Sequence, residues 1–330
     1  MKIFGWLADR SGCGFYRLML PGAELAKAGH SVMLDGTLPA PAKNGECDVI
    51  VGQRTCNEGA SITWQKLARA GHTKLVFETD DDLLSVDPSN KHAHRFYDED
   101  ACRRYVENMA VADVVTTTTD ALAERCAEIN PNVVVLPNMI PAWMLDHERP
   151  SGSGLVTVGW RGSLSHDRDF GELARPLRRF LLHPDYRNRA EFHAMGAPYH
   201  ERVKSNHGRL RWTGWHESVS EFLRAVDFDL AVIPLRPSVF NNSKSDLALL
   251  EMSALGIPAI VSNTGPYGQA AADGAPCRLA TMNQSDWQNH LRDFVDDAEA
   301  REQLGKDARE WAAGRTIEGN AWRWEEAYSS

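Results

Sequence analysis

The amino-acid sequence predicts an α/β protein made of two Rossmann-like, doubly wound domains that face each other across a central cleft. Its 330 residues correspond to about two domains of roughly 150 residues each. Short apolar segments alternate with helical stretches along the whole chain, which is typical of a parallel sheet covered by helices on both faces. This alternation is interrupted once, near the middle of the chain, by a segment rich in Pro, Ser and Gly.

The first domain is predicted over residues 1–140. Its strands are expected at 2–7, 31–34, 48–51, 73–78, 113–118 and 132–137. The helices between them are expected at 20–29, 62–71, 101–112 and 120–129. Gly29 and Gly71 stand at the ends of two of these helices, where glycine adopts the left-handed conformation that terminates a helix.

A linker is predicted at 141–154, and the same alternation starts again in a second domain at 155–314. Its strands are expected at 155–160, 190–196, 209–214, 229–235 and 257–262. Its helices are expected at 170–183, at 244–256 and in the tail from 283 onward. Ser218 and Glu221 form a capping box before a further short helix. Two such domains of similar size suit a ligand held between them.

Composition and charge exclude several classes of protein. The chain is 43% hydrophobic and 25% charged, as in ordinary globular proteins. No apolar run approaches the roughly 18 residues of a membrane span, so no span is expected. The net charge of −9 disfavours a nucleic-acid binder that relies on a basic surface. The six cysteines contain no C-x-x-C pair, which predicts free thiols and a cytoplasmic protein.

The segment predicted as a helix at 244–256 carries the strongest functional signal. Lys244 would lie in its first turn, where a cation opposes the helix dipole unless a bound anion shares the site. Glu251 lies in an otherwise apolar helix, where an ionised carboxylate needs partners. The two residues would share one helix face roughly 10 Å apart, which suits the phosphate and the ribose of a nucleotide diphosphate. The alternatives are a solvated Lys244, and a Glu251 that caps a loop or pairs with an arginine.

Four segments of the sequence extend this interpretation. They are VLPNMI at 135–140, VGWRGS at 158–163, LRWTGW at 210–215 and SKSDLALLEMSALGIPAIVSNTGPY at 243–267. In this order they resemble segments of GT-B glycosyltransferases, in particular the large retaining family whose donor-binding motif is Glu-x7-Glu. Ser243 occupies the position of the first glutamate of that motif. Because that glutamate contacts the transferred sugar in the family, its replacement leaves the sugar and the retaining stereochemistry open.

The resemblance implies a hexosyl- or related transferase that uses a UDP- or GDP-sugar as co-substrate and requires no further cofactor and no metal. It implies that the first domain binds the acceptor, that the second binds the donor, and that a helix at 315–330 packs back on the first domain. The implied donor-binding residues are Arg161, Gly162, Ser163, Trp215, Lys244, Ser245 and Glu251. Arg161 and Lys244 would stabilise the diphosphate as a leaving group, and Glu251 would bind the ribose.

The loop after the first predicted strand, DRSGCGFYR at 9–17, would face the ligand in such a protein. Gly12 and Gly14 permit a close approach of the backbone to a ligand. Arg17 would contact the acceptor or a phosphate. The alternative is that the loop is only a tight turn between a strand and a helix.

Asp80, Asp81 and Asp82 follow the strand predicted at 73–78, at the carboxyl end of the sheet. They are candidate catalytic residues, since a carboxylate there can orient an acceptor hydroxyl or act as a base. The alternative is helix capping and an Asx turn. The Asp80-x-Asp82 spacing also matches the metal-binding motif of single-domain GT-A glycosyltransferases, but the second domain argues against that architecture.

The sequence therefore predicts transfer of a sugar from a nucleotide-sugar to a hydroxyl acceptor. The acceptor stays open among a glycan, a small molecule and a hydroxylated base in DNA, so nucleic acid is considered only as a modified acceptor. The alternatives are a nucleotide-sugar epimerase or hydrolase of the same fold, and a non-catalytic module that binds a nucleotide-sugar.

Overall fold

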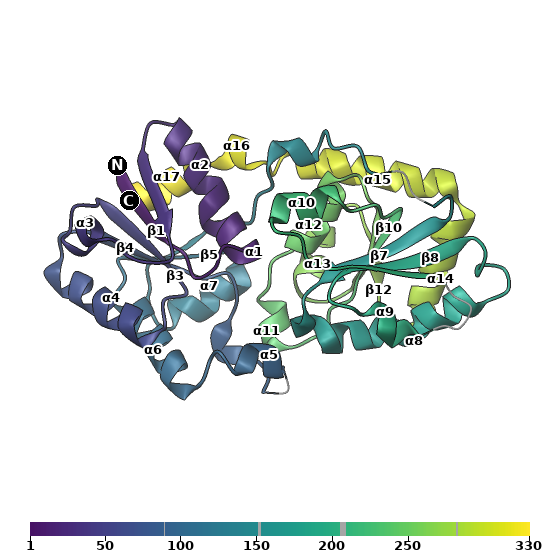
Figure 1. Cartoon of the computed structure of the whole chain (residues 1–330), viewed down its shortest axis with the longest axis horizontal. Coiled ribbons are helices and arrows are strands. Elements are labelled where there is room, and N and C mark those ends of the chain that lie inside the picture. The colour runs from purple at the N-terminus through teal and green to yellow at the C-terminus, as the bar shows by residue number, and fades with distance from the viewer. Residues whose placement is uncertain (89, 151–152, 205–208, 282) are drawn as a thin grey trace. The chain divides into compact units, whose positions relative to one another are not determined.

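The protein folds into two compact units, each built around one sheet (Figure 1). The first unit comprises Met1–Pro141, Ser243–Ser245 and Arg315–Ser330, and the second comprises Ala142–Asn242 and Asp246–Gly314. The computed structural model describes residues 1–88, 90–150, 153–204, 209–281 and 283–330. The linker predicted at 141–154 therefore falls partly on residues 151–152, outside the described residues.

The sheet of the first unit has six parallel strands in the order β2-β1-β3-β4-β5-β6. The strands are β1 (Lys2–Trp6), β2 (Ser31–Asp35), β3 (Val49–Gln53), β4 (Lys74–Glu78), β5 (Val114–Thr117) and β6 (Val133–Val135). The strand order reverses between β1 and β3, because the chain leaves β1 toward β2 and then returns to the other side of β1. In doubly wound sheets, ligands bind at the carboxyl ends of the strands beside such a reversal.

Helices cover both faces of this sheet, because successive strand residues point to opposite faces. Ile50 packs in a cluster with Trp64 of α4 (Glu58–Ala70), whereas its neighbour Val51 packs in a second cluster with Trp324 of α17 (Trp322–Ser329). The helices and turns are α1 (Gly12–Gly14), η1 (Phe15–Met19), α2 (Leu20–Lys27), α3 (Ala40–Lys43), α4 (Glu58–Ala70), η2 (Leu83–Ser85), α5 (Lys91–His94), α6 (Glu99–Ala110), α7 (Asp120–Ala127), α16 (Ile317–Asn320) and α17 (Trp322–Ser329).

The second unit also has a six-stranded parallel sheet, in the order β12-β11-β10-β7-β8-β9. The strands are β7 (Val156–Gly162), β8 (Ala190–Gly196), β9 (Leu210–Thr213), β10 (Leu230–Ile233), β11 (Ala259–Ser262) and β12 (Arg278–Ala280). The strand order reverses between β7 and β10. Phe192 of β8 packs with Phe170 of α8 and Leu291 of α14 in the hydrophobic core on one face.

The helices and turns of the second unit complete its two covering layers, as Figure 1 shows. They are η3 (Ala142–Met144), η4 (Leu164–His166), α8 (Asp167–Leu182), α9 (His200–Val203), α10 (Val219–Arg224), α11 (Val239–Asn242), α12 (Leu247–Ala254), α13 (Gly265–Ala272), α14 (Gln284–Asp296) and α15 (Ala298–Ala313). Within the described ranges, no helix combines the length and the apolar character needed to cross a membrane.

The prediction of two doubly wound, parallel α/β domains is confirmed, and two local predictions are wrong. The segment predicted as a loop at 9–17 becomes helical at Gly12, with one π turn at Phe15–Met19 before α2. The helix predicted at 244–256 covers only Leu247–Ala254.

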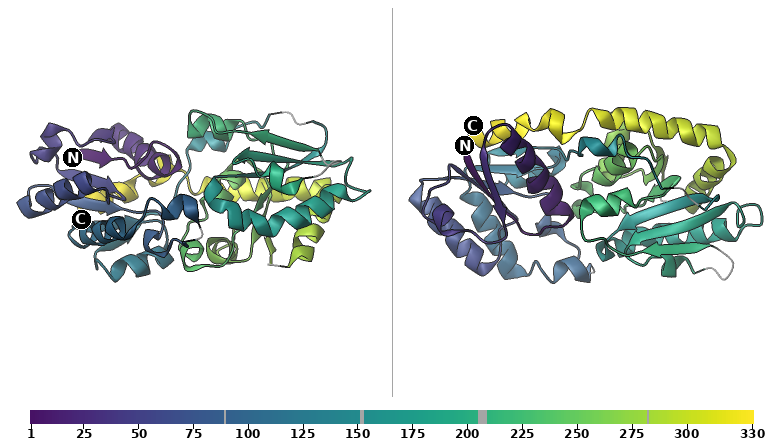
Figure 2. Two further views of the ribbon diagram at one scale, coloured as in Figure 1. Left: turned by 60° about the horizontal axis from the view of Figure 1, so that its bottom comes forward. Right: turned by 45° about the horizontal axis from the view of Figure 1, so that its top comes forward.

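The C-terminal segment belongs to the first unit. Ile140 and Thr316 form a parallel bridge, and α17 packs beside α2. Trp324 is fully buried there, and the Lys74 ammonium donates to the terminal Ser330 carbonyl. The two ends of the chain consequently lie side by side, as the views in Figure 2 show.

Candidate functional site

The second unit places Arg161 and Gly162 at the carboxyl end of β7. β7 lies between β8 and β10, at the reversal of strand order. Groups in that position contact ligands in doubly wound folds. The partly exposed Arg161 therefore presents a cation at the ligand-binding edge of this sheet.

Glu251 supplies a carboxylate to the same site. It lies in α12, and its side chain is only 2% exposed. It forms an ion pair with Arg161. An ionised carboxylate in an apolar helix needs such a partner, because burial removes the water that would otherwise solvate it. The pairing of Glu251 with an arginine was one of the alternatives that the sequence left open.

Tyr267 of α13 is a residue of this site that the sequence analysis missed. Burial raises the pKa of its phenol, and the nearby Arg161 offsets only part of that effect. The hydroxyl therefore stays protonated at neutral pH and can donate a hydrogen bond. The signal that could have indicated it is its place near the start of α13, the helix that follows the carboxyl end of β11.

Glycines and an exposed indole lie at the carboxyl ends of β7 and β8. Gly162 pairs in register with Gly196, whose φ of +87° favours glycine. A Cβ at Gly196 would stand 2.5 Å from the Gly162 carbonyl oxygen and 2.8 Å from the ring of Trp215. Trp215 is 58% exposed and packs on Phe222, with 4.6 Å between ring centroids. An indole in this position offers a flat apolar surface to a ligand.

The segment after β7 is held by a buried carboxylate. Ser163 begins the turn η4, and the next helix, α8, carries Asp169. Asp169 accepts hydrogen bonds from the backbone N–H of Arg236 at 2.9 Å and from Asn241 Nδ2 at 3.0 Å, and lies 2.9 Å from His166 Nδ1. These contacts fix the loop after β10 beside the loop after β7. Nothing in the local sequence pattern distinguishes Asp169 from the other acidic residues of α8.

Lys244 lies outside the helix that was predicted to contain it. The helix α12 begins at Leu247, with Asp246 as its N-cap residue. Several residues before Leu247 can cap a helix, so the sequence pattern leaves the start undetermined. Lys244 is therefore not a first-turn residue, and it does not share a helix face with Glu251.

Lys244 and Ser245 instead group with the first unit. Lys244 Nζ lies 2.9 Å from Asp81 Oδ1, and Asn138 Nδ2 donates to Ser245 Oγ at 2.8 Å. Burial alone would lower the pKa of Lys244, but the ion pair with Asp81 outweighs burial and raises it. Lys244 is consequently a charged ammonium at neutral pH.

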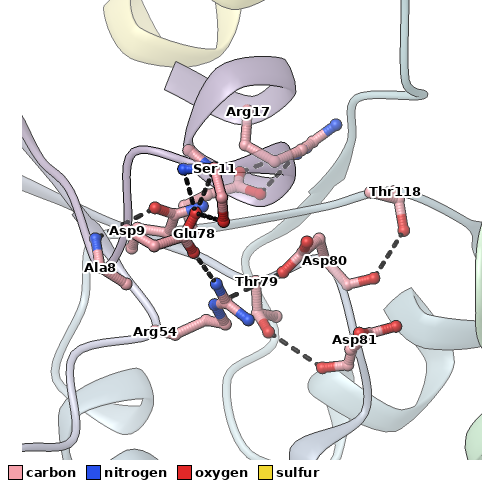
Figure 3. Close-up of polar contacts among 12 residues, drawn as sticks. Ala8, Asp9, Ser11, Arg17, Arg54, Glu78, Thr79, Asp80, Asp81 and Thr118 are labelled. Carbon is pink, nitrogen blue, oxygen red and sulfur yellow. Dashed lines mark hydrogen bonds and ion pairs between the residues drawn. The ribbon is translucent and has the colours of Figure 1, made fainter. Parts of the chain in front are cut away.

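The three aspartates after β4 are each paired with a different cation. Asp80 Oδ1 lies 3.6 Å from Arg54 Nε, and Asp82 pairs with Arg125. Asp81 takes the ion pair with the Lys244 ammonium. Figure 3 shows Asp80 and Asp81 on the loop after β4, with Arg54 between Asp9 and Asp80. In the part of the chain that the structure describes, no three His, Cys, Asp or Glu side chains gather as metal ligands.

Asp80 is an ionised carboxylate rather than a base poised near neutral pH. Burial alone would raise its pKa, but Arg54, a hydrogen bond from Cys13, and the cations Arg17 and Lys244 together lower it. An efficient general base has a pKa close to the working pH. Asp80 therefore suits electrostatic or hydrogen-bonding roles better than proton abstraction.

Arg17 is a buried structural residue, contrary to the expectation that it contacts an acceptor or a phosphate. Its side chain is 1% exposed, and Nε donates to Glu78 Oε1 at 2.6 Å. Its other nitrogens donate to the Leu136 carbonyl at 2.6 Å and to Asn138 Oδ1 at 3.1 Å. The guanidinium faces inward because Glu78, at the end of β4, is a buried carboxylate that needs a cation.

Gly12 and Gly14 lie in helical backbone and differ in their surroundings. Asp9 Oδ1 accepts a hydrogen bond from the Ser11 N–H at 2.9 Å (Figure 3). It also accepts one from the Gly14 N–H at 3.3 Å, and the two bonds fix the start of the helix. A Cβ at Gly14 would stand 1.9 Å from the Asp9 carbonyl oxygen. A Cβ at Gly12 would meet no described atom within 4 Å. Gly14 therefore serves close packing, and only Gly12 has open space beside it.

Comparison with solved structures shows which fold these units form. The chain matches HepE from Anabaena, in complex with UDP-glucose, with a TM-score of 0.72 and 14% identity over 100% of both chains. It matches the sucrose-phosphate synthase of Thermosynechococcus elongatus with a TM-score of 0.69 and 14% identity, over 100% of this chain and 98% of that chain.

A third match is WaaG, a glycosyltransferase involved in lipopolysaccharide biosynthesis, with a TM-score of 0.67 and 15% identity over 99% of this chain and 98% of that chain. No protein-family model matches the chain, and no curated protein matches its sequence significantly. The structural likenesses cover both units and show that the chain has the two-domain GT-B fold.

Proposed function

We propose that this protein transfers a sugar from a uridine diphosphate sugar to a hydroxyl group of an acceptor. The observation that carries the proposal is the Arg161–Glu251 pair at the carboxyl edge of the second sheet, beside the reversal of strand order. Structural neighbours support it, since HepE has been solved with UDP and with UDP-glucose.

The chemistry of the site follows from its charges. When the bond between the sugar and the diphosphate breaks, negative charge develops on the diphosphate, and a fixed cation such as Arg161 stabilises it. Glu251 would accept hydrogen bonds from the ribose hydroxyls once Arg161 turns its charge to the diphosphate. Gly162 and Ser163 would let the backbone approach the phosphates, and Trp215 would stack on the base.

Lys244 of the first unit, with Ser245 beside it, stays a proposed phosphate-binding cation, whose ammonium would exchange Asp81 for a phosphate oxygen. Ser243 stands where the family that this segment resembles has a glutamate directed to the transferred sugar, so position 243 supplies no carboxylate to that sugar. We assign the acceptor to the first unit, where Asp81 is the most exposed of the three aspartates and can orient a hydroxyl group.

Release of nucleotide from a panel of nucleotide-sugars tests the proposal. The full chain is incubated with UDP-glucose, UDP-N-acetylglucosamine and GDP-mannose, and free nucleotide and sugar are followed by chromatography. We expect slow release of UDP from a UDP-sugar, and its loss in Glu251→Gln. Glu302→Gln, an exposed carboxylate on α15, serves as the matched control and should keep the activity.

The other outcomes separate the alternatives. Conversion of one nucleotide-sugar into another would identify an epimerase, and tight UDP binding without turnover in any acceptor mixture would identify a binding module. If no nucleotide-sugar bound at all, the proposal would be wrong.

A further inference from the structure

A pocket of about 430 Å³ opens in the first unit, at the carboxyl ends of β1 and β3. We propose that it binds a carboxylate or phosphate group carried by a sugar-sized acceptor, an inference that rests on the proposed function. The pocket lies at the reversal of strand order, where doubly wound folds bind ligands. Its volume is within the range typical of small-molecule sites.

The charge of the lining favours an anion. Lys43 and Arg54 line the pocket, and none of the described residues that line it is a carboxylate, although the chain as a whole carries a net charge of −9. Arg54 already pairs with Asp9 at 2.6 Å and with Asp80 at 3.6 Å. Lys43 is exposed and has no ion-pair partner among the described residues. Its ammonium is therefore the charge that remains available to a ligand.

A buried amide adds a hydrogen-bond donor. Gln53, at the end of β3, lines the pocket and is 2% exposed. Its Oε1 accepts a hydrogen bond from the Ala8 N–H at 3.1 Å, which bridges the ends of β1 and β3. Its Nε2 is buried and has no hydrogen-bond partner among the described atoms. A buried donor without an acceptor costs free energy, which a ligand oxygen would recover.

The start of α4 contributes further donors. Asn57, Gly59 and Ala60 line the pocket, so the first turn of this 13-residue helix borders it. The first N–H groups of a helix have no acceptor within the helix, and the Asn57 side chain does not cap them. They carry the positive end of the helix dipole and favour an oxyanion. Glu58 also lies in this turn, but it does not line the pocket.

The aromatic side chain of Trp6 indicates that the ligand has an apolar face in addition to its anionic group. Trp6 lines the pocket, and its Nε1 donates to the Gly36 carbonyl at 3.1 Å, which holds the indole in place. The pocket therefore combines one aromatic side with a cluster of donors and a free ammonium. A sugar or polyol that bears a carboxylate or a phosphate matches this lining. Its C–H face would pack on the indole, and its anionic group would accept hydrogen bonds from the donors and pair with the ammonium.

Titration of the full chain with three sugars tests this inference. Glucose 6-phosphate, glucuronate and glucose are titrated separately, with and without saturating UDP, and binding is followed by calorimetry. We expect at least one anionic sugar to bind at millimolar concentration or below, about tenfold or more tighter than glucose, because its charged oxygens make charge-assisted hydrogen bonds. Comparison of the first two ligands shows whether phosphate or carboxylate is preferred.

Substitutions locate the binding. Gly59→Asp places a carboxylate at the pocket in a position where a Cβ meets no described atom, and an acidic residue in a first turn does not harm the helix. Ile62→Asp is the matched control, since Ile62 is 51% exposed on the same helix and does not line the pocket. We expect Gly59→Asp and Lys43→Gln to weaken binding of the anionic sugar about tenfold, and Ile62→Asp to leave it unchanged.

Three results would overturn the inference: no binding of either anionic sugar at millimolar concentration, equal binding of glucose, or equal effects of Gly59→Asp and Ile62→Asp. The affinity for UDP, measured on the same variants, separates this outcome from failure of the proposed function. If UDP binds all variants equally while the anionic sugars do not bind, only the pocket assignment fails. If UDP binds none of them, the proposed function fails.

Discussion

Individual carboxylates near the strand ends of this chain lie next to cations. Glu251 pairs with Arg161 in the second unit, and Asp81 pairs with Lys244 in the first. These pairs balance charges that would otherwise be costly to bury. A diphosphate would compete for the same cations. Donor affinity should therefore depend on the partner carboxylates as well as on the cations.

The buried ion pair between Arg17 and Glu78 should contribute to the stability of the first unit. Glu78→Gln keeps the shape of the side chain but leaves the guanidinium buried without a counter-charge. The variant should lose about 3–5 kcal/mol of unfolding free energy in urea titrations. Arg103→Gln is the control, because Arg103 is exposed beside Asp100 and should leave the midpoint nearly unchanged. Equal losses in the two variants would contradict this account of Arg17.

Gly14 and Gly12, at the start of the helical segment formed by α1 and η1, should differ in how much stability is lost when each is replaced by alanine. Gly14→Ala would press a methyl group against the Asp9 carbonyl and should destabilise the first unit by about 1–3 kcal/mol. Gly12→Ala, two residues away in the same element, has open space and should leave stability unchanged or raise it by about 0.5 kcal/mol. Chemical denaturation of both variants checks the difference. Equal stability of the two would show that the packing of this helix start is looser than described.

The carboxylate of Asp227 contacts side chains of both β8 and β9 and should help to hold these two strands together. Its carboxylate lies 2.7 Å from His193 Nδ1 on β8 and 2.8 Å from Arg211 on β9. Burial alone would raise the pKa of Asp227, but these contacts outweigh burial and lower it. The carboxylate therefore contributes stability above about pH 4, and this contribution is lost as the pH falls below that value.

Urea titrations between pH 7 and pH 3 test the role of Asp227. Asp227→Asn should be less stable than the natural chain at pH 7, and the difference should shrink as the pH falls through the acidic range. A difference that stays constant over this range would mean that the charge of Asp227 does not hold the two strands together.

Elements with a strong local pattern could be predicted from the sequence, and those that depend on distant partners could not. Strands such as β3 and β8 were located within two residues, because their apolar runs are bounded by turn residues. The start of α12 was misplaced because several capping residues precede it. The burial of Arg17 was missed because its partner Glu78 is 61 residues away.

The candidate site was predictable to a similar extent. Glu251 was singled out from its place in an apolar helix, and Arg161 from the resemblance of its segment to GT-B glycosyltransferases; the structure pairs them. Gln53 and Arg54 were not singled out from the sequence, because nothing in their local sequence shows that the ends of β1 and β3 enclose a pocket. The φ of +47° at Arg54 also has no sequence signal, since residues other than glycine rarely adopt it.

At the scale of the whole molecule, the chain returns to its first unit at the C-terminus. Ile317 and Trp324 complete a hydrophobic cluster that contains residues of β1 and β3. The core of the first unit is therefore complete only when the last residues of the chain pack on it. This dependence couples the stability of the N-terminal sheet to a segment more than 180 residues beyond the last of its strands.

Two tryptophans of α17 test this dependence. Trp324→Ala removes a fully buried indole and should cost the first unit about 3–5 kcal/mol. Trp322→Ala, on the same helix but 54% exposed, should change stability little. Hydrogen exchange resolved by peptide should show faster exchange in β1 and β3 for Trp324→Ala and an unchanged second unit. Faster exchange confined to the second unit would contradict the assignment of α17.

A calorimetric titration with UDP and UDP-glucose tests most directly the claim that the Arg161–Glu251 site binds a nucleotide-sugar. The natural chain should bind both ligands, Glu251→Gln should weaken binding about tenfold or more, and Glu302→Gln should bind normally. Circular dichroism should show that all three proteins are folded. Absence of UDP binding by the folded natural chain, or equal binding by Glu251→Gln, would contradict the claim.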